Sequence, residues 1–279
     1  MKAVCQVCMH HCALEPGQRG LCMARRNENG TVVCENYGRI TALALDPIEK
    51  KPLKRFRPGH AVLSVGSYGC NLQCPFCQNH EIAAVSGLQR QQMPGWIFLT
   101  PEELARKALL YRKAGNIGLA FTYNEPLIGW EYVRDTARLV KEQGMETVLV
   151  SNGTASPEVL EALLPYIDAM NIDLKGFRDA YYRRLGGSLE TVKGFISRAQ
   201  ADCHMELTTL IVPDENDSLA EMEEEARWIA SLDRNIPLHI TRFFPRHRMT
   251  DRAATDVKTI YRLAETAGRY LDYVYVGNC

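Results

Sequence analysis

The sequence has no excess of charge of either sign. Its 279 residues include 33 Lys and Arg and 33 Asp and Glu, so its formal net charge at pH 7 is zero. A chain without net positive charge has no overall attraction to nucleic acid or to an anionic membrane. We therefore predict that neither is a partner, and that ligands are recognised at local sites.

Long apolar runs are also missing. No segment approaches the roughly 18 consecutive apolar residues of a membrane-spanning helix, and the start of the chain has no apolar stretch after a basic one. The sequence thus predicts a soluble, cytoplasmic protein. In a reducing compartment its ten cysteines indicate metal binding or redox chemistry rather than disulfides.

Nucleotide-binding motifs are absent as well, since neither a G-x-G-x-x-G turn after the first barrel strand nor a Walker sequence occurs. Apolar strand-like runs instead alternate with helix-period segments. The runs cover residues 61–65, 117–122, 146–150, 167–174, 205–212, 237–241 and 273–276. Six alternations predict an α/β fold of parallel strands with helical crossovers, either a partial TIM-like (β/α)6 barrel or an open doubly wound sheet. One helix is expected to begin at Thr100-Pro101-Glu102-Glu103, which has the sequence of a capping box.

Three regions are expected along the chain. Residues 1–40 form a Cys-rich metal-binding module, residues 41–60 a basic connector and residues 61–279 the barrel. The connector contains Lys50, Lys51, Lys54, Arg55 and Arg57. It either docks an acidic electron donor, such as a flavodoxin or ferredoxin, or is a solvated linker.

Polar residues follow or interrupt several of the predicted strands. They are Tyr123 to Pro126, Ser151 to Gly153, Asn171, Asp173, Lys175, Arg242 and His247. In a barrel such residues meet at the carboxyl ends of the strands, where chemistry collects, although Asn-Gly and Asn-Glu-Pro are also ordinary turn sequences. Asp173 and Lys175 are two residues apart and face the same side, and burying such a pair is costly unless it binds something.

Three cysteines, Cys70, Cys74 and Cys77, directly follow the first predicted barrel strand. A 4Fe-4S cluster usually takes four thiolates, so three leave one iron open. An open coordination position is typical of a site that binds a substrate or co-reactant. A zinc site with His80 as the fourth ligand is the alternative, but the position of the loop and Phe76 favour a cluster.

A second group, Cys5, Cys8, Cys12 and Cys22, can supply four thiolates to a closed site. Zinc and an auxiliary 4Fe-4S cluster both accept four thiolates, and the spacing does not choose between them. Unligated thiols in a frayed terminus are the remaining alternative.

The loop Cys70-x3-Cys74-x-Phe76-Cys77 resembles the CxxxCxΦC motif of the radical S-adenosylmethionine (SAM) superfamily. The resemblance implies that the three cysteines hold a 4Fe-4S cluster, that SAM chelates the open iron through its amino and carboxylate groups, and that Phe76 packs on adenine. Tyr123-Asn124-Glu125 stands where the superfamily usually has Gly-Gly-Glu, which contacts the SAM amino group. Both glycines are missing here.

More narrowly, the sequence is similar to glycyl-radical-enzyme activating proteins, including the pyruvate formate-lyase activating enzymes. Asp173-Leu174-Lys175 matches their DLK stretch, Ser151-Asn152-Gly153 resembles their TNG segment, and His247 is a candidate near the ribose. The SAM-binding residues that the resemblance implies are Phe76, Gln78, Asn124, Glu125, Ser151, Asn152, Asp173, Lys175 and His247.

Over nearly its full length, including residues 35–53, 64–82 and 242–249, the sequence resembles the radical SAM member of the AmmeMemoRadiSam system. The implied function is reductive cleavage of SAM to methionine and a 5′-deoxyadenosyl radical, which abstracts hydrogen from a substrate. That substrate is either a glycyl-radical enzyme or another peptide or small molecule, and the implied partner is a one-electron donor of flavodoxin or ferredoxin type. An iron-sulfur electron carrier and a structural metal-binding protein are the alternatives from other classes.

Overall fold

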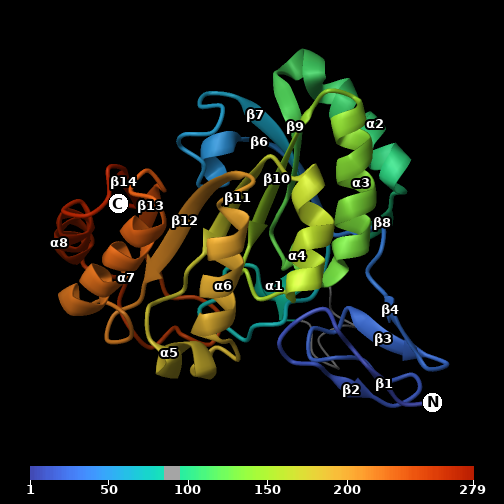
Figure 1. Ribbon diagram of the computed structural model, residues 1–279, viewed down its shortest axis with the longest axis horizontal. Helices are drawn as coiled ribbons and strands as arrows, with labels where there is room; N and C mark the ends of the chain where they lie inside the picture. The colour runs from blue at the N-terminus through green and yellow to red at the C-terminus, as the bar shows by residue number, and fades with distance from the viewer. Residues whose placement is uncertain (85–94) are drawn as a thin grey trace.

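The computed structural model describes residues 1–84 and 95–279. Its centre is an eight-stranded sheet with the order β14-β13-β12-β11-β10-β9-β7-β6 (Figure 1). The strands are β6 (Ala42–Pro47), β7 (Ala61–Gly66), β9 (Asn116–Phe121), β10 (Glu146–Ser151), β11 (Ala169–Asp173), β12 (His204–Ile211), β13 (Leu238–Arg242) and β14 (Val274–Gly277). Strands β7 and β9 to β14 are parallel and confirm the predicted strand runs, whereas β6 pairs with β7 in antiparallel orientation and was not predicted.

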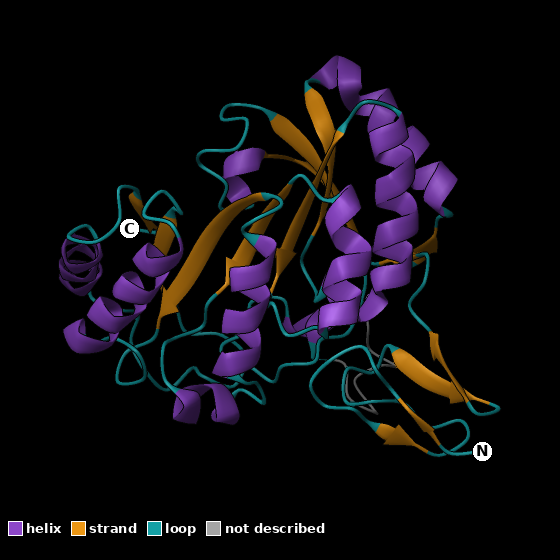
Figure 2. Cartoon of the chain, in the orientation of Figure 1, coloured by secondary structure: helices purple, strands orange, loops and turns teal. Residues whose placement is uncertain are grey.

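Helices cover the outer face of this sheet and form the crossovers between its parallel strands (Figure 2). They are α2 (Pro101–Leu110), α3 (Trp130–Glu142), α4 (Pro157–Leu163), α6 (Leu189–Ala199), α7 (Leu219–Leu232) and α8 (Val257–Ala267), with the shorter α1 (His80–Ala83) and α5 (Asp179–Arg184) in loops. Thr100 and Glu103 form the predicted capping box at the start of α2. No helix in either described range combines the length and the apolar character needed to cross a membrane.

Side chains alternate along the strands between the helix-facing and the inward-facing side. Leu63, Leu119, Leu149 and Met170 pack against the helices in the main core. The inward-facing cluster contains the smaller side chains Val62, Ala120, Val148 and Ala169. The small inward side chains leave room inside the partial barrel for side chains from another segment.

That segment is the connector. After β6 it forms a short 3-10 turn (Ile48–Lys50) and then passes into the barrel, where Ile48 and Leu53 are fully buried against the inward-facing cluster. Lys51 is 3% exposed and its Nζ lies 2.9 Å from the carboxylate of Asp46. Lys51 is therefore part of the interior and does not belong to a solvent-facing basic surface.

Glu206 on β12 fixes the connector in place. Its buried carboxylate accepts hydrogen bonds from the backbone N–H groups of Lys54 (3.0 Å) and Arg55 (2.7 Å). It also bonds the Nε2 atoms of His204 (2.9 Å) and His239 (2.6 Å). Burial opposes ionisation, but these hydrogen bonds outweigh it and lower the pKa of Glu206 to about 2.

Residues 1–40, which the sequence predicts to form an N-terminal module, contain two small antiparallel sheets, β1 (Ala3–Val4) with β2 (Ala13–Leu14) and β3 (Arg25–Glu28) with β4 (Thr31–Cys34). The last short strand, β5 (Arg39–Ile40), pairs with β8 (Ile97–Phe98). Cys8 forms an isolated bridge with Ala155, and the Ser156 N–H donates to the Val7 carbonyl at 2.9 Å. The module thus attaches to the loop after β10, at the end of the barrel toward which the strand arrowheads point in Figure 2.

Replacement of Glu206 by Gln is expected to lower the free energy of unfolding by about 1–3 kcal/mol near neutral pH, because an amide cannot accept hydrogen bonds at every position where the carboxylate does. Since the pKa of Glu206 is lowered from 4.5 to about 2, its contribution is present above 4.5 and is lost as the pH falls toward 2. Urea unfolding of both proteins across this range should therefore show the difference shrinking in acid. The exposed Glu265→Gln is the control, and an equal effect of both substitutions would contradict the assignment.

Candidate active site

A cavity of about 550 Å³ opens at the carboxyl ends of the strands. The sequence-predicted residues that line it are Cys70, Cys74, Phe76, Cys77, Gln78, Asn124, Glu125, Ser151, Asn152, Asp173 and Lys175. They come from the loop after β7 and from the ends of β9, β10 and β11. Parallel strands place their carboxyl ends at one edge, and this brings together residues that are about a hundred positions apart in the chain.

The three cysteines are half-buried, with thiols largely withdrawn from water. Burial raises the pKa of the Cys74 thiol to about 11 and raises the pKa of Cys70 and Cys77 as well. Buried thiols of this kind are neutral without a metal and become thiolates when they bind one. Phe76, between two of them, is 4% exposed and packs with Tyr181, Leu185, Val212, Phe243 and Met249.

Throughout residues 1–84 and 95–279, no three His, Cys, Asp or Glu side chains converge closely enough to hold a single metal ion. Cys70, Cys74 and Cys77 instead surround one side of the cavity. A cubane iron-sulfur cluster binds each thiolate at a different iron, so its ligands surround it and do not meet at one atom. The three thiols and the adjoining cavity therefore fit a cluster better than a zinc ion.

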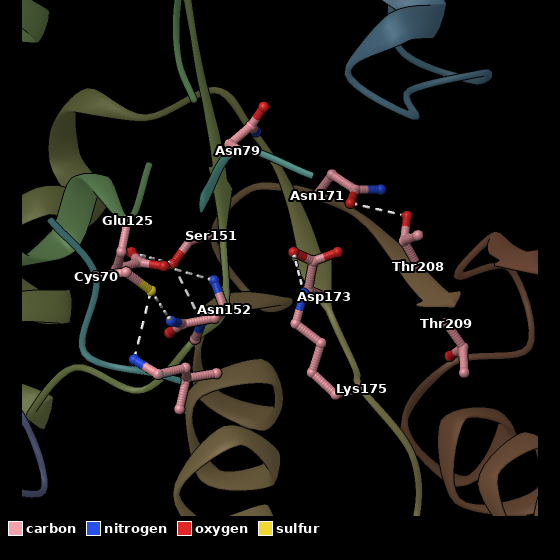
Figure 3. Close-up of polar contacts among 12 residues, drawn as sticks. Cys70, Asn79, Glu125, Ser151, Asn152, Asn171, Asp173, Lys175, Thr208 and Thr209 are labelled. Carbon is pink, nitrogen blue, oxygen red and sulfur yellow. Dashed lines mark hydrogen bonds and ion pairs between the residues drawn. The ribbon is translucent and has the colours of Figure 1, made fainter. Parts of the chain in front are cut away.

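Glu125 is the central polar group of the cavity (Figure 3). Its carboxylate accepts hydrogen bonds from the Ser151 hydroxyl (2.7 Å) and from the backbone N–H groups of Asn152 (2.8 Å) and Leu127 (2.9 Å). Burial raises the pKa of Glu125 to about 7 in spite of these donors. A cationic or hydrogen-donating ligand group in the cavity would favour the ionised carboxylate.

Two asparagines position the cysteine loop. The Asn124 amide donates to the carbonyl of Gly69 (3.1 Å) and its oxygen accepts from the Ser67 N–H (2.9 Å). The Asn152 amide donates to Asn71 Oδ1 (3.0 Å) and lies 3.7 Å from Cys70 Sγ. Asn124 thus holds the backbone of the loop, and Asn152 contacts its side chains.

Tyr123 occupies one of the positions where the sequence departs from the Gly-Gly-Glu pattern. Its φ angle is 72°, in the left-handed region that favours glycine. The Tyr123 hydroxyl donates to Asp46 at 2.7 Å, and the Lys51 ammonium lies 4.7 Å from the centre of its ring. Contacts with the connector therefore stabilise a backbone conformation that a glycine would adopt without strain.

Asp173 and Lys175 form the predicted charged pair, with Lys175 Nζ 2.8 Å from the Asp173 carboxylate. Both side chains line the cavity at the end of β11 (Figure 3). Each charge partly offsets the cost of burying the other, and both remain available to a zwitterionic ligand.

Other predicted residues lie elsewhere. His247 stacks on His80, with ring centres 4.4 Å apart, and is not among the residues that line the cavity. His80 Nδ1 is hydrogen-bonded to the Cys77 carbonyl at 3.2 Å. Arg242 donates to the Thr255 carbonyl, and Asn171 bonds the Pro52 carbonyl of the connector.

Several lining residues were missed in the sequence. Thr208, His239, Thr241 and Asn278 line the part of the cavity away from the cysteines, together with Glu49, Lys50, Pro52 and Lys54 of the connector. Thr208, His239 and Thr241 are polar residues at inward positions of otherwise apolar strands, and this pattern could have identified them. No sequence pattern indicated that the connector contributes to the cavity.

A separate, smaller cavity is lined by Cys5, Cys8, Cys12 and Cys22 of the N-terminal module. Burial raises the pKa of Cys22 to about 11, and raises that of Cys5 and Cys8. The second cysteine group predicted from the sequence is therefore brought together around one space.

The family model of the radical SAM superfamily matches residues 64–229, which is more than half of the sequence. The chain belongs to the radical SAM superfamily. The cofactors of this superfamily, a 4Fe-4S cluster and SAM, are therefore those of this protein.

Individual relatives agree with this assignment. An uncharacterised protein of Methanocaldococcus jannaschii is 37% identical over 99% of this radical SAM chain and 81% of its own length. The pyruvate formate-lyase-activating enzyme of Clostridium pasteurianum is 28% identical over 60% of this chain and 67% of that enzyme. The crystal structure of Streptococcus suis SuiB bound to S-adenosylmethionine shares the fold, with a TM-score of 0.59 and 14% identity over 76% of this chain and 48% of that one.

Proposed function

We propose that this protein is a radical SAM oxidoreductase in which Cys70, Cys74 and Cys77 hold the cluster and the cavity beside them holds SAM. Bound together, the two cofactors supply reductive cleavage of SAM to methionine and a 5′-deoxyadenosyl radical, which abstracts hydrogen from a substrate. The observation that carries the proposal is that one cavity contains these three thiols together with an aromatic side chain, a buried carboxylate and an ion pair.

Each lining residue has a role in this proposal. Phe76 packs on the adenine, Glu125 accepts hydrogen bonds from the SAM amino group, and Asp173 and Lys175 bind the methionine end. Ser151 and Asn152 hold the Glu125 carboxylate in position, and Asn124 holds the loop. The protein thus binds and orients, whereas the cofactors carry the bond-breaking chemistry. His247 stacks on His80, which bonds the Cys77 carbonyl, so it lies beside the cysteine loop and stays a candidate residue on the ribose side.

For the substrate we favour a glycyl-radical enzyme. The curated relative from Clostridium pasteurianum activates pyruvate formate-lyase by name. The sheet ends in two edge strands, β6 and β14, and the cavity is lined both by residues that follow β6 and by residues of β14 and the end of the chain. A cavity next to an open side of a partial barrel suits the insertion of a peptide segment. A one-electron donor of flavodoxin or ferredoxin type completes the reaction.

In anaerobically prepared protein with dithionite and SAM, we expect formation of 5′-deoxyadenosine. Cys74→Ala should abolish both the 4Fe-4S absorption of the main site and nucleoside formation, because the cluster loses one of three thiolates. Cys203→Ala is the matched control, since Cys203 bonds the Ala199 carbonyl and lines no cysteine cavity. Full nucleoside formation by Cys74→Ala would sink the assignment.

Glu125→Gln is expected to weaken SAM binding roughly 10- to 100-fold, the usual effect of losing a hydrogen bond to a charged group. The amide of the variant also directs donors toward groups that already donate, the Ser151 hydroxyl and the Asn152 N–H. Calorimetric titration of the reconstituted protein with SAM measures the change, with the exposed Glu102→Gln as control. Equal affinities of the two variants would remove Glu125 from the SAM site.

The substrate class is tested by electron paramagnetic resonance. Mixed with SAM, dithionite and a glycyl-radical enzyme of the same source organism, the protein should generate a glycyl radical signal on the partner, and Cys74→Ala should not. Nucleoside formation without any glycyl signal would turn the search toward the second substrate class, another peptide or a small molecule.

A further inference from the structure

The two cysteine sites are in direct contact through the residues that flank Cys70. Gly69 has a φ of 89°, and a Cβ atom at this position would lie 2.3 Å from the carbonyl oxygen of Cys22. Only glycine allows the two backbones to approach so closely. The loop that carries Cys70 therefore packs against the segment that carries Cys22.

On the other side of Cys70, Asn71 contacts both sites. Its carbonyl is hydrogen-bonded to His10 Nε2 at 2.8 Å, and Asn71 lines the cavity of the four module thiols. Asn71 Oδ1 accepts from Asn152, whose amide lies 3.7 Å from Cys70 Sγ. The residue that follows Cys70 thus forms part of the wall around the four module thiols.

The four module thiols line one cavity. A zinc ion would bind four sulfurs at about 2.3 Å from one atom, whereas a cluster would bind them on separate irons, so the iron and zinc content of the protein distinguishes the two.

The module thiols also differ in exposure. Cys5, Cys8 and Cys22 are buried, and Cys8 and Cys22 lie toward the barrel loop, while Cys12 is only half-buried and has the exposed His11 and Ala13 beside it. The group therefore has a side that faces the Cys70 loop and a side that faces solvent. A structural metal site needs no such polarity, but an electron relay does.

We propose that Cys5, Cys8, Cys12 and Cys22 bind a second iron-sulfur cluster, which accepts one electron from a protein donor and passes it through the Asn71 contacts to the cluster held at Cys70. The donor, a reduced flavin or iron-sulfur protein, is oxidised by one electron, and the cluster at Cys70 is reduced by one; no bond is formed or broken. The relay deepens the proposed function and rests on it.

The first test is the metal content of Cys70→Ala/Cys74→Ala/Cys77→Ala, reconstituted anaerobically with iron and sulfide. It should retain about four irons per chain and, after reduction by dithionite, an electron paramagnetic resonance signal that SAM leaves unchanged. The wild-type protein should contain about eight irons. One zinc and no iron in the variant would overturn the second cluster. If circular dichroism shows that the variant is unfolded, a wild-type content of about four irons overturns it instead.

The second test compares electron sources. Nucleoside formation is measured with reduced flavodoxin and with dithionite, a small reductant that does not depend on a docking path. In Cys12→Ser the ratio of flavodoxin-driven to dithionite-driven nucleoside formation should fall sharply. The control is Cys34→Ser, which removes a half-buried thiol of the same module that does not line the cysteine cavity.

The outcomes separate the two proposals. An unchanged ratio in an iron-loaded Cys12→Ser protein overturns the relay and leaves the proposed function standing. If wild-type protein with intact clusters forms no nucleoside even with dithionite, the proposed function fails, whereas the iron content of the variant still decides whether the second cluster exists.

Discussion

The site depends on the hydrogen bonds that one buried carboxylate receives. Glu125, at the end of β9, receives donors from Ser151 and Asn152 at the end of β10, while its own backbone N–H donates to the Gly69 carbonyl in the loop after β7. A buried carboxylate without partners would be strongly destabilising. The bonds that reduce this cost also fix three consecutive strand ends relative to one another, and with them the position of Cys70.

The interior of the barrel changes from apolar to polar along its length, and the cavity lies in the polar part. At one end the small inward side chains of β7 and β9 to β11 pack on Leu53 of the connector. Farther along, Thr208 and Asp173 face the cavity. Glu206 lies between the two layers and ties the connector backbone to β12. The connector thus packs inside one end of the barrel and forms part of the cavity wall at the other, and its buried Lys51 has a structural role.

The N-terminal module carries the second cysteine group and is attached close to the first. It attaches at the loop after β10 and at residues 68–71, next to the groups that position Cys70. Its buried thiols are neutral without a metal, so binding one there would contribute to the stability of the module as well as to any redox function. In the relay proposed above, the surfaces that hold the two cysteine groups together would also carry the electron between them.

Local patterns in the sequence determined the barrel strands, the capping box of α2, the two cysteine groups and part of the cavity lining, because strand periodicity and cysteine spacing involve residues that are near in the chain. The tertiary structure decided the features that depend on contacts between residues far apart in the chain. The connector runs inside the barrel because Lys54 bonds Glu206, 152 positions away, and His247 is placed beside the cysteine loop by its stacking on His80. The importance of Asn71 also has no sequence signal, since its partners, His10 and Asn152, meet it only when the module and the barrel have folded against each other.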